Sequence, residues 1–176
     1  MVLIYRISQV LDSVRSKADL KRLSMTHDID PSFRVEADAL ALEQVLINFF
    51  DNAIKYNPEG GKIEVTAIQE DGMIRVEVSD DGPGIAPKHH ARIFERFYRV
   101  DRGRSRDMGG TGLGLAIVKN LTEAMGGQVG LKKSEYGGSC FWFSLPDSDN
   151  TPSYAPPVNA EELEKKSEGE SDAEQP

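Results

Sequence analysis

The most regular pattern of apolar and polar positions lies in the stretch that follows Asp38. Its apolar residues recur at i, i+3, i+4 and i+7, and they are Leu42, Val45, Leu46, Phe49, Phe50, Ala53 and Ile54. This period predicts an amphipathic helix whose apolar stripe faces a core. Asp38 suits the N-cap position, and the run Asn57-Pro58-Glu59-Gly60-Gly61 is expected to end the helix.

A second stripe of the same period lies nearer the N-terminus, within residues 3–23. Its apolar members, set among charged residues, are Leu3, Ile7, Val10, Leu11, Val14 and Ala18. We interpret this amphipathic helix as the end of a longer helical segment, with residues 1–24 as a unit of their own. Pro31 then breaks the pattern, and residues 32–37 are predicted to form a short strand that leads to Asp38.

The remaining pattern combines strands and helices. Residues 62–68 and 73–78 alternate with a period of two around the turn Glu70-Asp71-Gly72, which predicts a β-hairpin. A helix near residues 88–100, a loop to residue 110, a helix over about 113–125 and a closing hairpin that ends at Leu145 are expected to follow. This order predicts an α+β fold, a layered domain over residues 25–146 with helices on one face of the sheet.

Composition separates a tail from this domain. A chain of 176 residues with 39% hydrophobic content suits one domain with a real core. From residue 147 onward, nine acidic and two basic residues account for −7 of the net charge of −8. We therefore expect residues 147–176 to be a disordered acidic tail. The charge of −1 that remains gives the domain no basic face for nucleic acid.

The cysteine and histidine residues argue against metal and disulfide chemistry. Cys140 is the single cysteine and lies in an alternating, strand-like run, which indicates a core thiol. Neither it nor the three histidines show metal-ligand spacing, and His89 and His90 are expected to face solvent. The sequence lacks a signal-peptide core and an apolar run of about 20 residues. These features favour a cytoplasmic chain.

Candidate chemistry begins on the helix that follows Asp38. Asn48, Asn52 and Lys55 are spaced four and three residues apart and share a face beside the apolar stripe. In one interpretation the two amides simply face solvent. In the other they offer oxygens to Mg²⁺, which prefers hard oxygen ligands and borrows others from phosphates. Lys55 would then meet a phosphate, and Tyr56 would present a flat face to a base.

Two glycine-containing stretches add possible ligand contacts. One interpretation of the run Asp80-Asp81-Gly82-Pro83-Gly84 is a plain turn. In the other, its glycines let the backbone approach a flat ligand closely, and a carboxylate accepts a hydrogen bond from an amine such as that of adenine. Residues 109–114 directly precede a helix, and such a glycine-rich segment is suited to binding a phosphate with its main-chain amides. They lack the Gly-Lys-Ser/Thr ending of a P-loop. Arginines 99, 102, 104 and 106 are equally well explained as a solvated charge run.

Four stretches in one order carry a resemblance to a known family. They are residues 48–56, 80–85, 94–99 and 110–115. Together they resemble the N, G1, F and G2 boxes of the ATP-binding domain of sensor histidine kinases, in the superfamily of gyrase and Hsp90. The resemblance covers roughly residues 35–146. It implies a two-layer α/β sandwich of the Bergerat type with a mixed, mainly antiparallel sheet, which binds ATP and Mg²⁺ under a flexible lid.

The resemblance also implies roles for the box residues. The catalytic set would be Asn48, Asn52 and Lys55, with Asn52 as the main Mg²⁺ ligand, Asn48 beside it and Lys55 on phosphate. The base pocket would be formed by Tyr56, Asp80, Gly82, Gly84 and Ile85, with Asp80 accepting from the adenine amine. The lid would be anchored by Phe94 and Phe97. Its other cofactor-binding positions would be Tyr98, Arg99, Gly110, Thr111, Gly112, Leu113 and Gly114.

By the same resemblance, the chain is the catalytic domain of a histidine protein kinase. It would donate the γ-phosphoryl of ATP to a histidine on a dimerisation domain absent from this chain, for transfer to a response regulator receiver domain. Residues 1–24 would be the end of a truncated dimerisation helix, any membrane anchor would lie upstream, and the isolated chain would be a monomer. His27 is not expected to be the acceptor.

Two details complete this interpretation. In hydrolytic members of the superfamily a glutamate takes the place of Asn48 and activates water, whereas an amide cannot accept that proton. Slow ATP hydrolysis is therefore expected. The alternatives are a serine kinase of the anti-sigma type and a nucleotide-binding interaction module without phosphotransfer.

Overall fold

The computed structural model describes residues 1–100 and 111–149, and these form a sheet with helices packed on it. The helices are α1 (Leu3–Leu20), α2 (Ala39–Tyr56), α3 (Pro87–His90) and α4 (Gly114–Ala124). The strands are β1 (Ser24–Asp28), β2 (Lys62–Glu70), β3 (Met73–Asp80), β4 (Gln128–Lys133) and β5 (Ser139–Pro146). Their order in the sheet is β1-β2-β3-β5-β4. β1 runs parallel to β2, and the other pairs are antiparallel.

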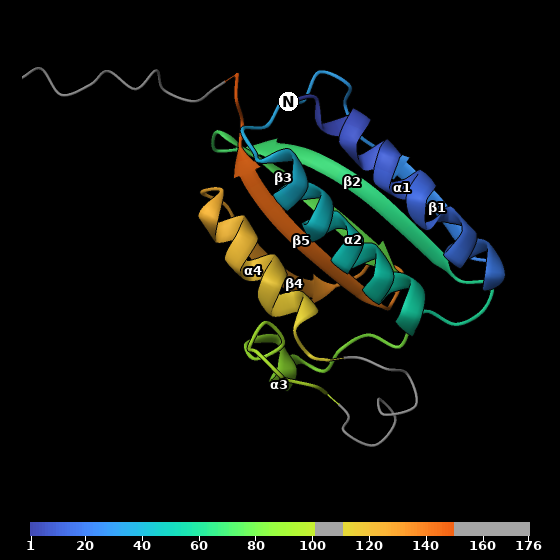
Figure 1. Ribbon diagram of the computed structural model, residues 1–176. Helices are drawn as coiled ribbons and strands as arrows, with labels where there is room; N and C mark the ends of the chain where they lie inside the picture. The colour runs from blue at the N-terminus through green and yellow to red at the C-terminus, as the bar shows by residue number, and fades with distance from the viewer. Residues whose placement is uncertain (101–110, 150–176) are drawn as a thin grey trace, which may run out of the picture.

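The helices α1, α2 and α4 lie on the same face of the sheet, with α2 between the other two (Figure 1). The apolar stripe of α2 is fully inside, as the sequence predicts, because all seven of its predicted core residues are buried. Phe49 of α2 packs against the rings of Phe141 and Phe143 of β5, with centroids 5.5 and 6.0 Å away. This arrangement confirms the α+β fold and the mixed, mainly antiparallel sheet.

The start of α2 is fixed by its own N-cap. The Asp38 carboxylate accepts hydrogen bonds from the amides of Leu40 and Ala41 at 3.0 and 2.8 Å. These amides have no partner within the helix, so the side chain satisfies two free donors and defines the first turn. The predicted cap is confirmed, and it sets the register of every side chain along α2.

Helix α1 packs into the same core as the rest of the domain. Its six predicted core residues are buried, and they belong to one apolar cluster with residues of α2 and the sheet. Two ion pairs also join the helices, Arg6 to Glu43 at 3.5 Å and Lys17 to Asp51 at 2.8 Å. This packing argues against a boundary at residue 24, because the apolar face of α1 is covered by α2.

Two predicted elements differ from the observed ones, and one observed strand was not predicted. Residues 32–37 form no strand, and Arg34 and Val35 make only isolated bridges, to Val2 and Asp147 respectively. The edge strand is instead β1, whose exposed His27 lies opposite Val65. The helix expected near residues 88–100 is reduced to the short α3.

The packed part of the chain extends past residue 146, where the domain was expected to end. Asp147 is buried, accepts a hydrogen bond from the Gln69 amide at 2.5 Å, and accepts another from the main-chain amide of Asp149 at 2.9 Å. Residue 147 therefore belongs to the folded domain. The predicted tail from residue 150 onward lies outside the described residues.

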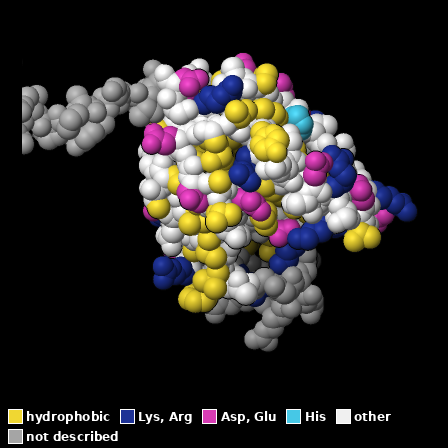
Figure 2. Space-filling view, turned by 45° about the horizontal axis from the view of Figure 1, so that its top comes forward, with side chains coloured by type: hydrophobic (Ala, Val, Ile, Leu, Met, Phe, Trp, Pro, Cys, Tyr) yellow, Lys and Arg dark blue, Asp and Glu magenta, His cyan; other side chains and the backbone are white. Residues whose placement is uncertain are grey.

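The single thiol lies in the core, as the sequence predicts. Cys140 is buried, and this burial raises the pKa of its thiol to about 11. Acidic and basic side chains are interspersed on the face drawn in Figure 2, without a field of one sign. Within residues 1–100 and 111–149, no helix combines the length and apolar character needed to cross a membrane.

Candidate nucleotide site

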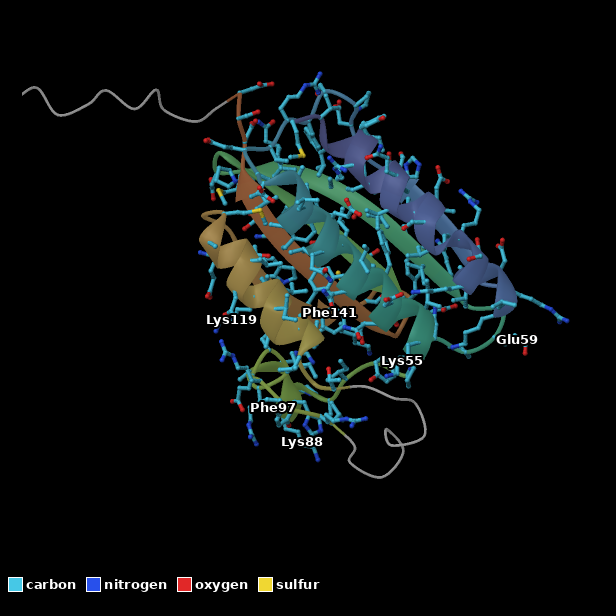
Figure 3. The ribbon with its side chains drawn as sticks, in the orientation of Figure 1. Lys55, Glu59, Lys88, Phe97, Lys119 and Phe141 are labelled. Carbon is cyan, nitrogen blue, oxygen red and sulfur yellow. The ribbon has the colours of Figure 1, made fainter. Side chains whose placement is uncertain are left out.

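The last three turns of α2 carry the predicted metal and phosphate ligands. Asn48, Asn52 and Lys55 are all half-buried, and Lys55 lies at the end of the helix (Figure 3). The Asn48 amide donates to the main-chain oxygen of Gln44 at 2.8 Å. Since its nitrogen is engaged, its Oδ1 is the atom that faces Gly114, where an added Cβ would come within 2.6 Å of it. The first and fourth boxes therefore meet at this contact.

The residues present fit a magnesium ion held mainly by phosphate and water. Asn48 and Asn52 offer neutral amide oxygens one helical turn apart, which is a hard donor set. No group of three or more His, Cys, Asp or Glu side chains that could hold a metal occurs among the described residues. A site built on these amides would therefore depend on a polyphosphate for most of its charge. The Lys55 ammonium, at the end of the same helix, lies 5.2 Å from the Tyr56 ring centroid.

Asp80 ends β3 as a buried carboxylate and is only 8% exposed. Its Oδ1 accepts hydrogen bonds from the amides of Gly82 at 2.9 Å and Ser139 at 3.0 Å. Burial raises the pKa of the Asp80 carboxyl, and these two bonds partly oppose that effect. Because both bonds use Oδ1, Oδ2 is left to accept from a ligand amine.

Glycines make the close packing around Asp80 possible. A Cβ on Gly138 would lie 2.3 Å from Asp80 Oδ1 and 2.6 Å from the Gly82 nitrogen. Gly84 has a φ of +70° and faces the main-chain oxygens of Gly137 and Gly138. The turn between β4 and β5 thus forms part of the predicted base pocket. Sequence reasoning missed it, although two glycines before a serine were the available signal.

The segment after Gly84 is held by packing against the core and by hydrogen bonds. Ile85 packs against the core, and its carbonyl accepts from the His90 Nε2 at 2.8 Å. The His89 Nδ1 and the Tyr98 hydroxyl lie 2.6 Å apart and are hydrogen-bonded. Both histidines are half-buried, so the expectation that they face solvent is wrong. The Arg92 guanidinium also covers the Tyr98 ring, 4.4 Å from its centroid.

The two predicted lid anchors behave differently. Phe94 packs against the core, edge-on to Phe141 with centroids 6.4 Å apart. Phe97 is 70% exposed and has a φ of +63°, which also explains why no regular helix continues through it. Its side chain (Figure 3) therefore does not anchor the lid. The link is instead its amide, which donates to the Gly112 carbonyl at 2.9 Å.

The remaining lid positions are only partly described. Thr111 is exposed, and its Oγ1 accepts from the Leu113 amide at 3.4 Å. Arg99 is half-buried. Gly110 lies outside the described residues, as do arginines 102, 104 and 106.

Comparisons with known proteins agree with this geometry. The sensor-like histidine kinase SenX3 of Mycolicibacterium smegmatis is 37% identical over 149 residues, which cover 85% of this chain and 39% of that protein. The solved structure of full-length ShkA in complex with AMPPNP is 37% identical, with a TM-score of 0.72, and the match covers 91% of this chain and 32% of the ShkA chain. Histidine kinase ThkA in complex with the response regulator protein TrrA matches 86% of this chain and 42% of its own, with 28% identity and a TM-score of 0.71.

The family model that matches this chain describes a single domain of such proteins. The chain spans 39% of the length of the SenX3 relative, so it corresponds to part of that protein. The model is that of the histidine kinase-, DNA gyrase B- and HSP90-like ATPases, and it matches residues 37–149. These residues include the end of α2, the Asp80 turn and the described part of the lid. The chain therefore belongs to the family of histidine kinase-, DNA gyrase B- and HSP90-like ATPases.

Proposed function

We propose that this chain is the Mg-ATP-binding catalytic domain of a sensor histidine kinase. The observation that carries the proposal is the meeting of three elements at one end of the sandwich. The amide of Asn48 touches Gly114, the end of α2 adjoins Gly82, and Gly82 in turn binds the buried Asp80. A base acceptor, a phosphate cation and two amide oxygens are therefore presented to one ligand. The relative SenX3, named as a sensor-like histidine kinase, and the similarity to the AMPPNP complex of ShkA support this assignment.

The proposed reaction transfers the γ-phosphoryl group to a histidine of a dimerisation domain outside this chain. A ring nitrogen of that histidine forms a bond to the γ-phosphorus, and the bond from this phosphorus to the β–γ bridging oxygen breaks, which releases ADP. This chain contributes position and charge. Asp80 fixes the base, and Lys55 neutralises phosphate charge. Asn48 and Asn52 would hold Mg²⁺, which would supply further charge neutralisation.

Hydrolysis by this domain is expected to be slow. By the family resemblance, Asn48 takes the place of the general base of hydrolytic members, and its amide nitrogen donates to the Gln44 carbonyl. An amide cannot take a proton from water at neutral pH. The γ-phosphoryl is therefore retained until an acceptor histidine arrives. Rapid steady-state release of phosphate from Mg-ATP by the purified chain would contradict this step.

The first test is calorimetric titration of Mg-ATP into the wild-type chain and two variants. Asn52→Ala removes a proposed Mg²⁺ ligand, and it should weaken binding about tenfold or more. Gln44→Ala is the matched control, because this exposed side chain lies two turns earlier on the same helix and only its main chain contacts Asn48. EDTA should reduce the wild-type affinity toward that of Asn52→Ala. No heat of binding in a folded wild-type chain would refute the proposal.

The second test supplies the partners. With a dimerisation domain from a related histidine kinase and labelled ATP, we expect acid-labile, base-stable phosphate on that domain. Addition of a receiver domain should then remove the label. Acid-stable phosphate would contradict histidine as the acceptor. The proposal also places the chain in the cytoplasm, and size-exclusion chromatography should give a monomer in the absence of the dimerisation domain.

A further inference from the structure

The C-terminal end of α2 is capped by a lysine from outside the helix. The Lys21 ammonium, in the turn that follows α1, donates to the main-chain oxygens of Ile54, Lys55 and Asn57 at 2.8, 3.0 and 2.6 Å. The last carbonyls of a helix lack intrahelical partners and carry the negative end of its dipole. All three protons of one ammonium are therefore used at the place where a cation is most stabilising.

Neither α2 nor its C-cap residue supplies the hydrogen bonds that Lys21 donates to these carbonyls. The C-cap residue Asn57 has an extended conformation, with φ −73° and ψ 144°, rather than the left-handed one of a glycine cap. Only its amide returns to the helix, donating to the Ala53 carbonyl at 3.1 Å. The orientation of the final turn therefore depends on Lys21.

Main-chain contacts hold Lys21 itself in place. The carbonyl of Lys21 accepts from the Gly60 amide at 2.9 Å, and the Ser24 amide donates to the Gly61 carbonyl at 2.9 Å. An exposed ion pair between Arg22 and Glu59, at 3.4 Å, bridges the same two loops. Figure 3 shows Glu59 beside the end of α1. The turn after α1 and the loop after α2 thus form one unit.

This unit continues into the nucleotide site. The capped turn carries Lys55 and Tyr56, and the Asn57 side chain donates to the Lys62 carbonyl at 3.0 Å. A Cβ on Gly82 would lie 3.0 Å from Asn57 Oδ1 and 3.5 Å from the Tyr56 carbonyl, so the end of α2 rests against the base loop. A shift of the capped turn would move Lys55 and Tyr56 relative to Gly82.

We propose that Lys21 is a positioning residue of the nucleotide site. It orients the final turn of α2 and thereby places Lys55 for phosphate and Tyr56 for the base. Because Lys21 directly follows α1, it also couples the position of α1 to nucleotide affinity. This inference rests on the proposed function, since it assumes that Mg-ATP occupies the site.

The test compares Mg-ATP affinity among folded variants by calorimetry, at a temperature where circular dichroism shows each to be fully native. Lys21→Met keeps the length of the side chain and removes the charge, and it should weaken binding about tenfold. The matched control is Lys17→Met, which breaks the ion pair with Asp51 one turn earlier on α1 and should change affinity less than about twofold.

A double-mutant cycle separates positioning from general stability. In a Lys55→Ala background, Lys21→Met should cost much less affinity than in the wild type, because part of its effect passes through Lys55. If Lys21→Met does not fold, Lys21→Arg replaces it. This variant keeps the charge but not the three divergent donors, and a loss of about threefold is expected.

Three other outcomes would contradict the inference, and the last of them would also contradict the proposed function. Wild-type affinity in folded Lys21→Met or Lys21→Arg, with only a lower unfolding midpoint, would show that Lys21 is purely structural and overturn the inference alone. Equal losses in the wild-type and Lys55→Ala backgrounds would also overturn it. A wild-type chain that does not bind Mg-ATP would instead refute the proposed function, and the inference with it.

Discussion

Two regions flank the end of α2, and they are held in place by different means. The base side, residues 80–84 and 137–139, is packed around a buried carboxylate that accepts two main-chain hydrogen bonds. The lid side, residues 94–98 and 111–114, contains no fully buried residue, and its two halves are joined by the bond from the Phe97 amide to the Gly112 carbonyl. Under the proposed function, a preformed base pocket would lie beside a phosphate cover with few internal restraints.

This difference predicts how each region responds to strain. A residue packed on all sides has no alternative position, so a clash there is opposed by the whole fold. An exposed segment escapes a clash by opening locally, and the cost then cannot exceed the free energy of that opening. Substitutions of matched kind in the two regions therefore measure how rigid each one is.

The largest effect is expected for Gly138→Ala on the base side. The new Cβ would lie 2.3 Å from Asp80 Oδ1 and 2.4 Å from the Asp80 carbonyl oxygen, and main chain cannot yield easily. We expect a loss of about 3 kcal/mol in the free energy of unfolding and a large loss of Mg-ATP affinity. Urea unfolding monitored by circular dichroism measures the first quantity.

Gly137→Ala is the control for that variant. Gly137 has a φ of +96° but no atom within 4 Å of its Cβ position, so the variant carries backbone strain without the clash. We expect about 1–2 kcal/mol of destabilisation from the strain alone. Equal losses for Gly137→Ala and Gly138→Ala would mean that the packing around Asp80 is looser than described.

The second effect tests the two lid phenylalanines against each other. Phe94 packs against Phe141, so Phe94→Ala removes partly buried apolar surface and should cost about 2 kcal/mol of unfolding free energy. Phe97 is 70% exposed, and Phe97→Ala should change the same quantity by less than about 0.5 kcal/mol. Thermal unfolding of the two variants side by side measures the contrast. A cost for Phe97→Ala as large as that for Phe94→Ala would place its ring in the core.

The contrast between Phe94 and Phe97 also shows what sequence can predict. Periodic stripes were predicted residue by residue, because the period alone decides which side of a helix or strand faces the core. The two phenylalanines belong to one short motif without a period, so nothing local separated the buried ring from the exposed one. The same holds for Val35, which is buried although its segment forms only isolated bridges.

Contacts between segments that are far apart in the chain could not be predicted from the sequence. Ser139 reaches Asp80 across 59 positions, and Lys21 reaches Asn57 across 36. The glycine pair before Ser139 and the polar end of α2 gave hints, but their partners depend on how β3 and β5 pair and how α1 lies on α2. Conversely, Asp80, Asn48 and Gly114 were singled out by their motifs, and the structure brings Asn48 next to Gly114.

The third effect concerns charge on the base side. Asp80→Asn keeps an oxygen to accept from Gly82 and Ser139 but loses the carboxylate that would accept from adenine. Mg-ATP affinity should fall about tenfold or more, as measured by calorimetry. The control is Asp81→Asn, because Asp81 accepts from the Lys62 amide at 2.7 Å, on the far side of the turn. A similar loss in both variants would argue against Asp80 as the base contact.

The Asp80→Asn variant also tests how the stability of the domain depends on pH. Burial raises the pKa of the Asp80 carboxyl above its ordinary value of 3.8, so the native state binds this proton more tightly than the unfolded state does. The carboxyl's contribution to stability therefore increases as pH falls through the raised pKa toward 3.8. Without nucleotide at pH 7, Asp80→Asn should be at least as stable as the wild type, and its advantage should shrink on acidification. Urea unfolding at several pH values measures this difference.

A much smaller effect on stability than that of Gly138→Ala is expected for Gly112→Ala on the lid side. Gly112 has a φ of +72°, a backbone strain that is not present at Gly138, and its new Cβ would lie 2.9 Å from the Phe97 Cα, which is a milder clash than the one at Gly138. The lid can relieve both by separating Phe97 from Gly112, which should limit the loss of unfolding free energy to less than about 1 kcal/mol. Hydrogen exchange at the Phe97 amide should accelerate, because its bond to the Gly112 carbonyl is broken. Mg-ATP affinity should fall several-fold, since the closed lid becomes less favourable. A stability loss equal to that of Gly138→Ala, with unchanged exchange at Phe97, would mean that the lid is as firmly held as the base side.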